Sequence, residues 1–315
     1  MGQAAGLSDG VKGKLSLIMI DILYNVQHHE AAGVLIAVYF YLTGISAGSF
    51  ILSTLAYVFG QAKYKPIGKI AVVLATVVLI IAPMALLIHV GRPFRAWRLF
   101  YNINFTSPIS WGSFLLTLYP INCIIYGYFV FKNNAKMTKL FGTIGIPLAV
   151  SVHGYCGFIL GFAKARHLWN TALMPVLFLV SAIVSGIALV IFVVYIRDRF
   201  FSQEGKVREE LIFDLAKLMA GFLLFDLFLV LSDVLILLAG NEDAIKAGWL
   251  LLTGKFAIPF LAIENGLGKV LPAILIFSTR LRTPNRMVLA SFLVMFGILF
   301  MRLVVVLAGE YYPLI

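Results

Sequence analysis

Charged residues are scarce in this sequence. Asp, Glu, Lys and Arg together make up 12% of the 315 residues, whereas hydrophobic residues make up 61% and the mean hydropathy is +0.98. A soluble domain cannot bury that much apolar surface, and several apolar runs reach the roughly 20 residues that a helix needs to cross a bilayer. The runs are continuous rather than alternating, which excludes a β-barrel. The composition predicts an all-α integral membrane protein.

Cysteine is also scarce, and its placement excludes some metal sites. The two cysteines, Cys123 and Cys156, lie inside apolar runs, and the sequence contains no Cys-x-x-Cys pattern. Iron–sulfur clusters and zinc sites are typically held by thiolates at such close spacings, so we expect neither in this protein. No small-residue cleavage site follows the apolar stretch at 15–23, so we expect no cleavable signal peptide.

Eight apolar segments have the length of membrane spans. They cover residues 31–59, 69–89, 111–131, 141–161, 170–195, 217–239, 249–277 and 286–307. Asp21 interrupts the shorter apolar stretch within residues 1–30, and we expect this N-terminal segment to lie along the membrane interface. The first four spans and the start of the fifth fall within residues 31–196. A charged connection at 197–216 separates them from the remaining helices at 217–315.

The distribution of Lys and Arg predicts the orientation. Eight spans place both termini on one side, together with the connection at 89–112, and this side carries eight basic residues. The opposite side carries fourteen. Basic residues accumulate in cytoplasmic loops, so the termini and the 89–112 connection are predicted to face outward. The same rule accounts for the net charge of +11 without any nucleic-acid partner.

Polar side chains from several helices are expected near one level at the outer ends. Asn25 and His29 are four residues apart and so share a helix face, with His28 beside them. His89 ends the second span, and the fourth brings His153 and Tyr155. These side chains suit a quinone, whose two carbonyls need donors and whose redox change moves protons. A b-type haem held by two of the residues His29, His89 and His153 is an alternative that periodicity does not separate from it.

The connection at 89–112 is too rich in functional side chains to be a simple turn. It carries Arg92, Arg95, Trp97 and Trp111, together with Arg98. Aromatic and arginine side chains are enriched where proteins dock, so we expect a docking surface for a partner subunit.

Several charged side chains fall inside the second group of spans. Asp226, Asp233, Glu264 and Arg302 are predicted at middle depth, where ionisable groups are costly and face the bundle interior. They have two interpretations: structural ion pairs, or a path for protons. An ion or solute transporter would also use such charges. Lys269 is expected near the inner boundary, extending to the headgroups, whereas Lys255 is expected deep within a span, paired there with Asp233 or Glu264.

The motifs in the first half resemble those of the NrfD/PsrC family. The matches are H-V-G-R-P at 89–93, Trp97, T-S-P-I-S-W-G at 106–112 and Y-L-T-G-I-S-A-G at 41–48, with further similarity around Tyr155, Glu264–Gly266 and Arg302–Gly309. The resemblance implies two four-helix bundles that hold no haem or iron–sulfur cluster of their own. It assigns quinone binding to Asn25, His29 and Tyr155, with menaquinone or ubiquinone as the exchangeable ligand.

The same resemblance implies a multi-subunit respiratory oxidoreductase. Its membrane subunit exchanges electrons between the quinone pool and a ferredoxin-like iron–sulfur subunit that docks on the outer face, at Arg92 and Arg95. That iron–sulfur protein leads to a catalytic subunit such as a molybdopterin enzyme. The expected location is the cytoplasmic membrane of a bacterium or archaeon. The membrane subunit alone is expected to have no complete catalytic activity.

Overall fold

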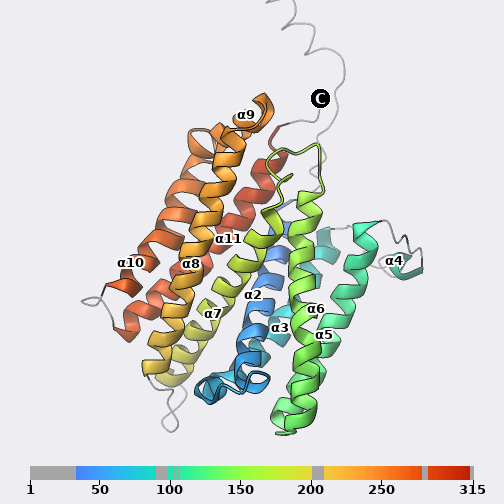
Figure 1. Ribbon diagram of the computed structural model, residues 1–315, viewed down its shortest axis with the longest axis vertical. Coiled ribbons are helices and arrows are strands. Elements are labelled where there is room, and N and C mark those ends of the chain that lie inside the picture. The colour runs from blue at the N-terminus through green and yellow to red at the C-terminus, as the bar shows by residue number, and fades with distance from the viewer. Residues whose placement is uncertain are drawn as a thin grey trace, which may run out of the picture. The chain divides into compact units, whose positions relative to one another are not determined.

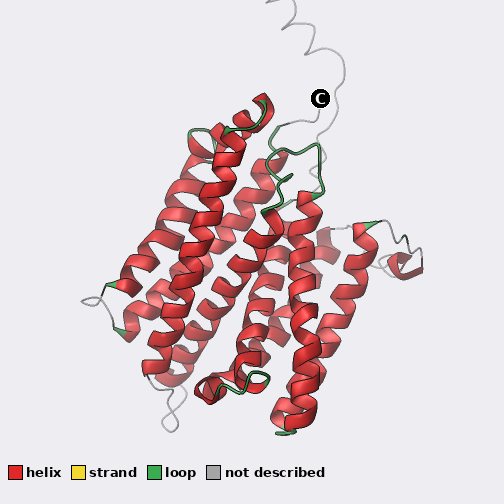
Figure 2. Cartoon of the chain, viewed as in Figure 1, coloured by secondary structure: helices red, strands yellow, loops and turns green. Residues whose placement is uncertain are grey.

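The computed structural model describes residues 33–89, 98–101, 104, 107–200, 209–278 and 283–312. Within these ranges every regular element is a helix (Figure 2). Eight helices are long and apolar enough to cross a membrane, which confirms the predicted all-α fold and the number of spans. Asn25, His28, His29, Arg92, Arg95 and Trp97 lie outside the described residues.

The described elements follow one another in sequence as in Figure 1. They are α2 (Val34–Tyr57), η1 (Ala62–Tyr64), α3 (Lys65–His89), α4 (Arg98–Tyr101), α5 (Pro108–Phe131), α6 (Ala135–Gly161), α7 (Met174–Phe200), α8 (Glu209–Leu238), α9 (Glu242–Leu252), η3 (Ile258–Val270), α10 (Leu271–Phe277) and α11 (Pro284–Glu310).

Local sequence signals fix several helix starts. Pro108 and Pro284 occupy the first turn of α5 and α11, where a missing backbone N–H costs nothing. The Asn134 side chain accepts a hydrogen bond from the backbone N–H of Met137 at 3.2 Å, and thereby caps α6. Asn241 caps α9 in the same way.

The helix contacts form two connected groups. In the first, α2 contacts α3 and α6, and α5 contacts both α3 and α6; in the second, α7 contacts α8 and α11, and η3 contacts both α8 and α11. The two groups meet mainly where α2 packs on α7. Gly48 and Gly186 make that contact close: a Cβ added to Gly48 would stand 2.1 Å from the backbone oxygen of Ala182. Small residues at a membrane helix contact allow such an approach.

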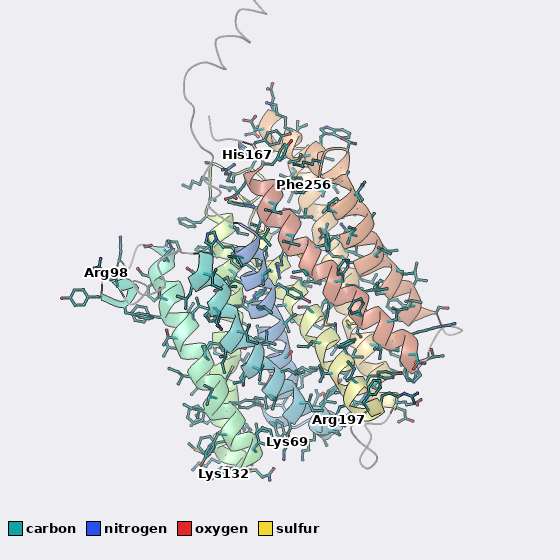
Figure 3. The ribbon with its side chains drawn as sticks, turned by 180° about the vertical axis from the view of Figure 1, so that it is seen from behind. Lys69, Arg98, Lys132, His167, Arg197 and Phe256 are labelled. Carbon is teal, nitrogen blue, oxygen red and sulfur yellow. The ribbon has the colours of Figure 1, made fainter. Side chains whose placement is uncertain are left out.

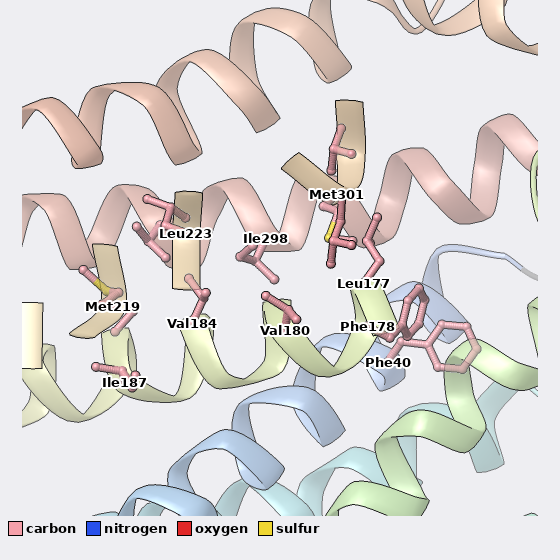
Figure 4. Packing of buried hydrophobic residues seen from close by; sticks show 14 of the residues in the cluster. Phe40, Leu177, Phe178, Val180, Val184, Ile187, Met219, Leu223, Ile298 and Met301 are labelled. Atoms are coloured by element: carbon pink, nitrogen blue, oxygen red, sulfur yellow. The ribbon is translucent and has the colours of Figure 1, made fainter. Parts of the chain in front are cut away.

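The largest apolar core lies along α7. Figure 4 shows Val180, Val184 and Ile187 of this helix facing side chains of α8 and α11, among them Leu223 and Ile298. The opposite situation holds on the outside of the helices, where large apolar side chains such as Ile80, Leu118 and Phe228 are more than half exposed. Such surfaces are stable in lipid rather than in water.

The seventh span begins later than the sequence predicts. The predicted range was 249–277, but α9 ends at Leu252 and the span starts at Ile258. Between them, Lys255 is exposed at the helix break, with its ammonium 5.6 Å from the centroid of the Tyr311 ring. The prediction that Lys255 lies within a span is therefore wrong, because the break moves it to the end of the helices.

Basic side chains gather at one end of the spans. Figure 3 shows Lys69, Lys132 and Arg197 at one end and His167 and Phe256 at the other. We call the first the inner end and the second the outer end, following the predicted orientation. Tyr155 lies near the outer end, since α6 finishes six residues later at Gly161.

Candidate functional site

Tyr155 lies against α5 at the outer end of the helices. A Cβ added to Gly112 would stand 2.2 Å from the phenol oxygen of Tyr155, so only glycine leaves room for this ring. Gly112 is the last residue of the Ser-Trp-Gly motif, and the neighbouring Trp111 and Ile109 are 54% and 57% exposed. The motif therefore provides the surface on which the Tyr155 ring rests.

The hydroxyl of Tyr155 is available to a ligand. Its side chain is half-buried, and it forms no hydrogen bond to any of the described residues. A phenol both donates and accepts hydrogen bonds, and burial makes a missing partner costly. A ligand carbonyl beside Tyr155 would receive this hydrogen bond.

The residue that follows Tyr155 has a structural role. The Cys156 thiol is fully buried and lies 3.9 Å from both the Thr43 hydroxyl and the Tyr39 hydroxyl of α2. It also donates to the backbone oxygen of Val152 at 3.3 Å. These contacts fix the turn of α6 that carries Tyr155 against α2.

His153 is buried between the two helix groups rather than open at the outer end. Its Nε2 lies 3.1 Å from Nη2 of Arg302, and its ring stacks on Phe178 with centroids 5.8 Å apart. Arginine only donates, so Nε2 accepts and the neutral ring carries its proton on Nδ1. Gly44 admits the ring, because a Cβ there would stand 2.8 Å from Cε1. With Nε2 bound to Arg302, His153 is not free to hold a quinone or haem iron.

Arg302 connects three helices. From α11 its Nη2 contacts His153 of α6 and donates to two groups of α7, the Ser181 hydroxyl at 2.6 Å and the Phe178 backbone oxygen at 3.2 Å. The guanidinium carbon also lies 3.7 Å from the centroid of the Phe178 ring, a cation–π contact. We call Arg302, His153, Ser181 and Phe178 the Arg302 cluster.

A second buried group joins α8 to η3. The ammonium of Lys269 lies 2.8 Å from Asp226 and 3.0 Å from Glu264, and all three side chains are at most 2% exposed. We call these residues the Lys269 triad. The prediction that Lys269 reaches the headgroups is wrong, because two carboxylates hold its ammonium inside the protein.

The helix type explains the position of Lys269. η3 is a 13-residue π-helix, with hydrogen bonds between residues five apart. In an α-helix, residues 264 and 269 would lie about 140° apart around the axis. The wider turn of η3 brings Glu264 and Lys269 onto one face, and the Asn265 amide likewise donates to the backbone oxygen of Phe260, five residues earlier, at 2.8 Å. No pattern in the sequence signals this change of helix type.

Asp233 and Glu264 line a small cavity between the helices of the second group. The cavity offers about 30 Å³ to the centres of water molecules, enough for one or two. Oδ1 of Asp233 and Oε2 of Glu264 have no hydrogen-bond partner within the described part of the protein. Two carboxylates and a space for water are the components of a proton-transfer step.

The buried charges balance. When ionised, Asp226 and Glu264 carry two negative charges, and Lys269 and Arg302 carry two positive charges. The two carboxylates also interact electrostatically with Arg302, which links the Lys269 triad to the Arg302 cluster. Such an arrangement reduces the cost of placing charge in an apolar interior.

The other predicted residues have mixed outcomes. His89 is the last residue of α3, and Trp111 lies in the first turn of α5, at the outer end. The roles assigned to Asn25, His28 and His29, and to Arg92, Arg95 and Trp97, stay predictions, since these residues lie outside the described ranges. Sequence reasoning missed Ser181, Phe178 and Gly112, each of which acts only through a distant partner.

These features define a class of membrane protein: eight spans, a tyrosine open to ligand at one end, and paired charges buried in the second group of helices. The family described as Polysulphide reductase, NrfD, has a sequence model that matches residues 27–313. The chain belongs to this family.

Three relatives illustrate the similarity. The C subunit of the selenate reductase of Mesobacillus selenatarsenatis is 30% identical over 66% of this sequence and 57% of its own length. The Hdr-like menaquinol oxidoreductase integral membrane subunit of Archaeoglobus fulgidus is 30% identical over 71% of this sequence and 60% of its own. The C polypeptide of the polysulfide reductase of Wolinella succinogenes is 26% identical over 87% and 93%. The match thus spans under two thirds of the first two relatives.

Proposed function

We propose that this protein is the quinone-reactive membrane subunit of a multi-subunit respiratory oxidoreductase. The names of its relatives support this: all three are parts of reductases or oxidoreductases, and one is named for menaquinol. In the proposed complex, electrons pass between a menaquinone or ubiquinone pool and an iron–sulfur subunit, and from there to or from a catalytic subunit.

The half-buried Tyr155 hydroxyl is the observation on which the proposal rests. It has no protein partner among the described residues and lies at one end of the spans, over Gly112. A quinone fits this donor, because its carbonyl oxygens accept hydrogen bonds and its ring is apolar. When bound, a quinone supplies two-electron redox chemistry coupled to protons. Tyr155 would donate to one carbonyl, while Asn25 would orient the ring and His29 would exchange the proton.

The surface around α4 is the proposed docking site for the iron–sulfur subunit. Tyr101 and Phe100 are 83% and 44% exposed there, and Trp111 is 54% exposed. Aromatic side chains in such numbers at the outer end favour a protein partner. Arg92 and Arg95 precede α4 in the sequence and would contribute positive charge to the same surface.

A second proposed role, supported by the cavity at Asp233 and Glu264, is proton transfer through the second group of helices. Water in that cavity would connect the two carboxylates, and Asp226 and Arg302 would continue the path toward His153. His153 is two residues from Tyr155. This role depends on water between the charged groups, whereas the ion pairs alone would serve stability.

The test of the quinone site separates two activities of the intact complex. Tyr155→Phe removes a single hydrogen-bond donor and should lower quinol-linked turnover about tenfold, while dye-linked turnover, which bypasses the membrane subunit, is retained. His29→Ala should act in the same way. Tyr128→Phe is the matched control, since Tyr128 is exposed toward the inner end of α5. Unchanged quinol turnover in both site variants would refute the proposal.

The rival functions have their own tests. A transporter would purify without an iron–sulfur protein, whereas the proposed subunit brings one with it. A b-type cytochrome would show a haem band in the reduced-minus-oxidised optical spectrum.

A further inference from the structure

A cavity of about 610 Å³ lies at the inner end of the first four spans, far along the helices from Tyr155. It is lined by residues of α2, α3, α5 and α6 and of the turns between them, including Tyr57, Gly60, Lys65, Lys69, Asn133 and Thr138. Its volume falls in the range typical of small-molecule sites. No function assigned above uses it.

The lining of this cavity is positively charged. Lys65 and Lys69 line it, no lining residue is acidic, and neither lysine forms an ion pair with any of the described residues. The nearby Lys63 differs, because it pairs with Asp214 of α8. Two lysines without a carboxylate partner leave the cavity able to bind an anion.

The helix geometry adds to the positive potential. α3 begins at Lys65 and α6 begins at Ala135, and both residues line the cavity. The first backbone N–H groups of each helix carry partial positive charge. Gly60 and Asn133, at φ 70° and 53°, form the two tight turns that bring these helix starts together.

The surroundings favour a lipid headgroup over a soluble anion. Phe59, Tyr128 and Phe131 are each more than half exposed at this end, and the ammonium of Lys69 lies 5.7 Å from the centroid of the Phe131 ring. Aromatic side chains of this kind mark the boundary between lipid and water. Basic pockets between membrane helices at headgroup depth are suited to anionic lipids.

We propose that this cavity binds the phosphate headgroup of an anionic phospholipid. Lys65 and Lys69 contact the phosphate, the Thr138 and Asn133 side chains are within the same cavity as hydrogen-bond donors, and the acyl chains lie on the exposed apolar surface of α3 and α5. This lipid is a structural ligand that joins the helix pairs α2–α3 and α5–α6 at their inner ends.

The test measures lipid binding by the purified complex in detergent. Phosphatidylglycerol, phosphatidylcholine and glycerol phosphate are titrated separately, and the unfolding midpoint of the membrane subunit is followed, with native mass spectrometry to count retained lipids. The variant is Lys65→Gln/Lys69→Gln. The control is Lys136→Gln/Lys139→Gln, which removes the same charge from exposed positions of α6 that do not line the cavity.

We expect phosphatidylglycerol to raise the midpoint saturably in the natural protein and in the control, with one lipid retained. The cavity variant should need about tenfold more lipid for the same effect. Equal lipid affinity in the two variants would overturn the proposal, as would an equal response to phosphatidylcholine. A full response to glycerol phosphate would identify a soluble anion instead, and binding that appears only after partner subunits are removed would identify a protein occupant.

Discussion

Gly112 and Tyr155 are packed so closely that a methyl group on the glycine would overlap the phenol of the tyrosine. Gly112→Ala should therefore displace the ring without changing any polar group. We expect quinol-linked turnover to fall about tenfold, as in Tyr155→Phe, because the same hydrogen bond is lost. Steady-state turnover with a quinol and with a dye donor measures the effect.

α5 also offers the control for this substitution. A Cβ added to Gly127 would meet only Val72, at an ordinary 3.6 Å. Gly127→Ala should leave both activities unchanged. If the two alanine variants behave alike, the space at Gly112 is not needed for quinol turnover.

Removing Lys269 should destabilise the protein strongly. Lys269→Met leaves Asp226 and Glu264 buried without their common partner, which typically costs about 3–5 kcal/mol. Thermal or denaturant unfolding in detergent measures the loss. The combined variant Lys269→Met, Asp226→Asn, Glu264→Gln should recover much of it, because no buried charge of the triad is left unpaired.

Lys246→Met is the control for this loss, since Lys246 and Asp243 form an exposed pair on α9 at 3.0 Å. Exposed pairs contribute little to stability, so the unfolding midpoint should hardly move. A Lys269 variant as stable as this control would mean that water already solvates the triad.

The contact between α2 and α7 should be sensitive to a single methyl group. Gly48→Ala places a Cβ against the Ala182 backbone oxygen, which cannot move aside, so we expect about 1–3 kcal/mol of destabilisation. Gly221→Ala on α8 adds its methyl group to open space and should be neutral or slightly stabilising. Unfolding of the two variants side by side gives the comparison, and equal stability would argue against tight packing at Gly48.

Asp233→Asn tests the proton path. The amide keeps the size of the side chain but cannot carry a proton, so proton uptake coupled to quinol turnover should slow by about 10²-fold in proteoliposomes. Dye-linked turnover should not change. Asp243→Asn, on the exposed surface of α9, is the matched control. Normal proton uptake in the Asp233 variant would leave the cavity with a structural role alone.

The orientation can be tested without first removing native cysteines. Cys123 and Cys156 are both fully buried, so a membrane-impermeant thiol reagent should not label the natural protein. Lys246→Cys, at the outer end, should be labelled in intact cells, and Lys132→Cys, at the inner end, only after lysis. The reverse pattern would place the proposed docking surface on the cytoplasmic side.

The apolar runs were sufficient to predict eight spans, because a helix in lipid must keep its side chains apolar over its whole length. They did not predict the break at Lys255, where a few residues interrupt an otherwise suitable run. They also misplaced Lys269, since depth was counted along an α-helix and the segment is a π-helix paired with α8.

The partner of His153 is a different case. Arg302 is 149 residues away, and no spacing rule connects positions on the fourth and eighth spans. The sequence predicted a histidine near the outer end of α6 but not that its ring turns inward between helix groups. The contact of Gly112 with Tyr155 is likewise tertiary, although the motif that contains the glycine was recognised.

Because Arg302 belongs to the last span and binds groups on the fourth and fifth, its contacts form only after the ribosome has delivered nearly the whole polypeptide. Until then His153 and the hydroxyl of Ser181 wait inside the membrane with a polar partner still missing. A nascent polypeptide that stops before residue 302 would expose these groups to the quality-control proteases of the membrane. Synthesis of the final helix would thus decide whether the earlier ones are retained.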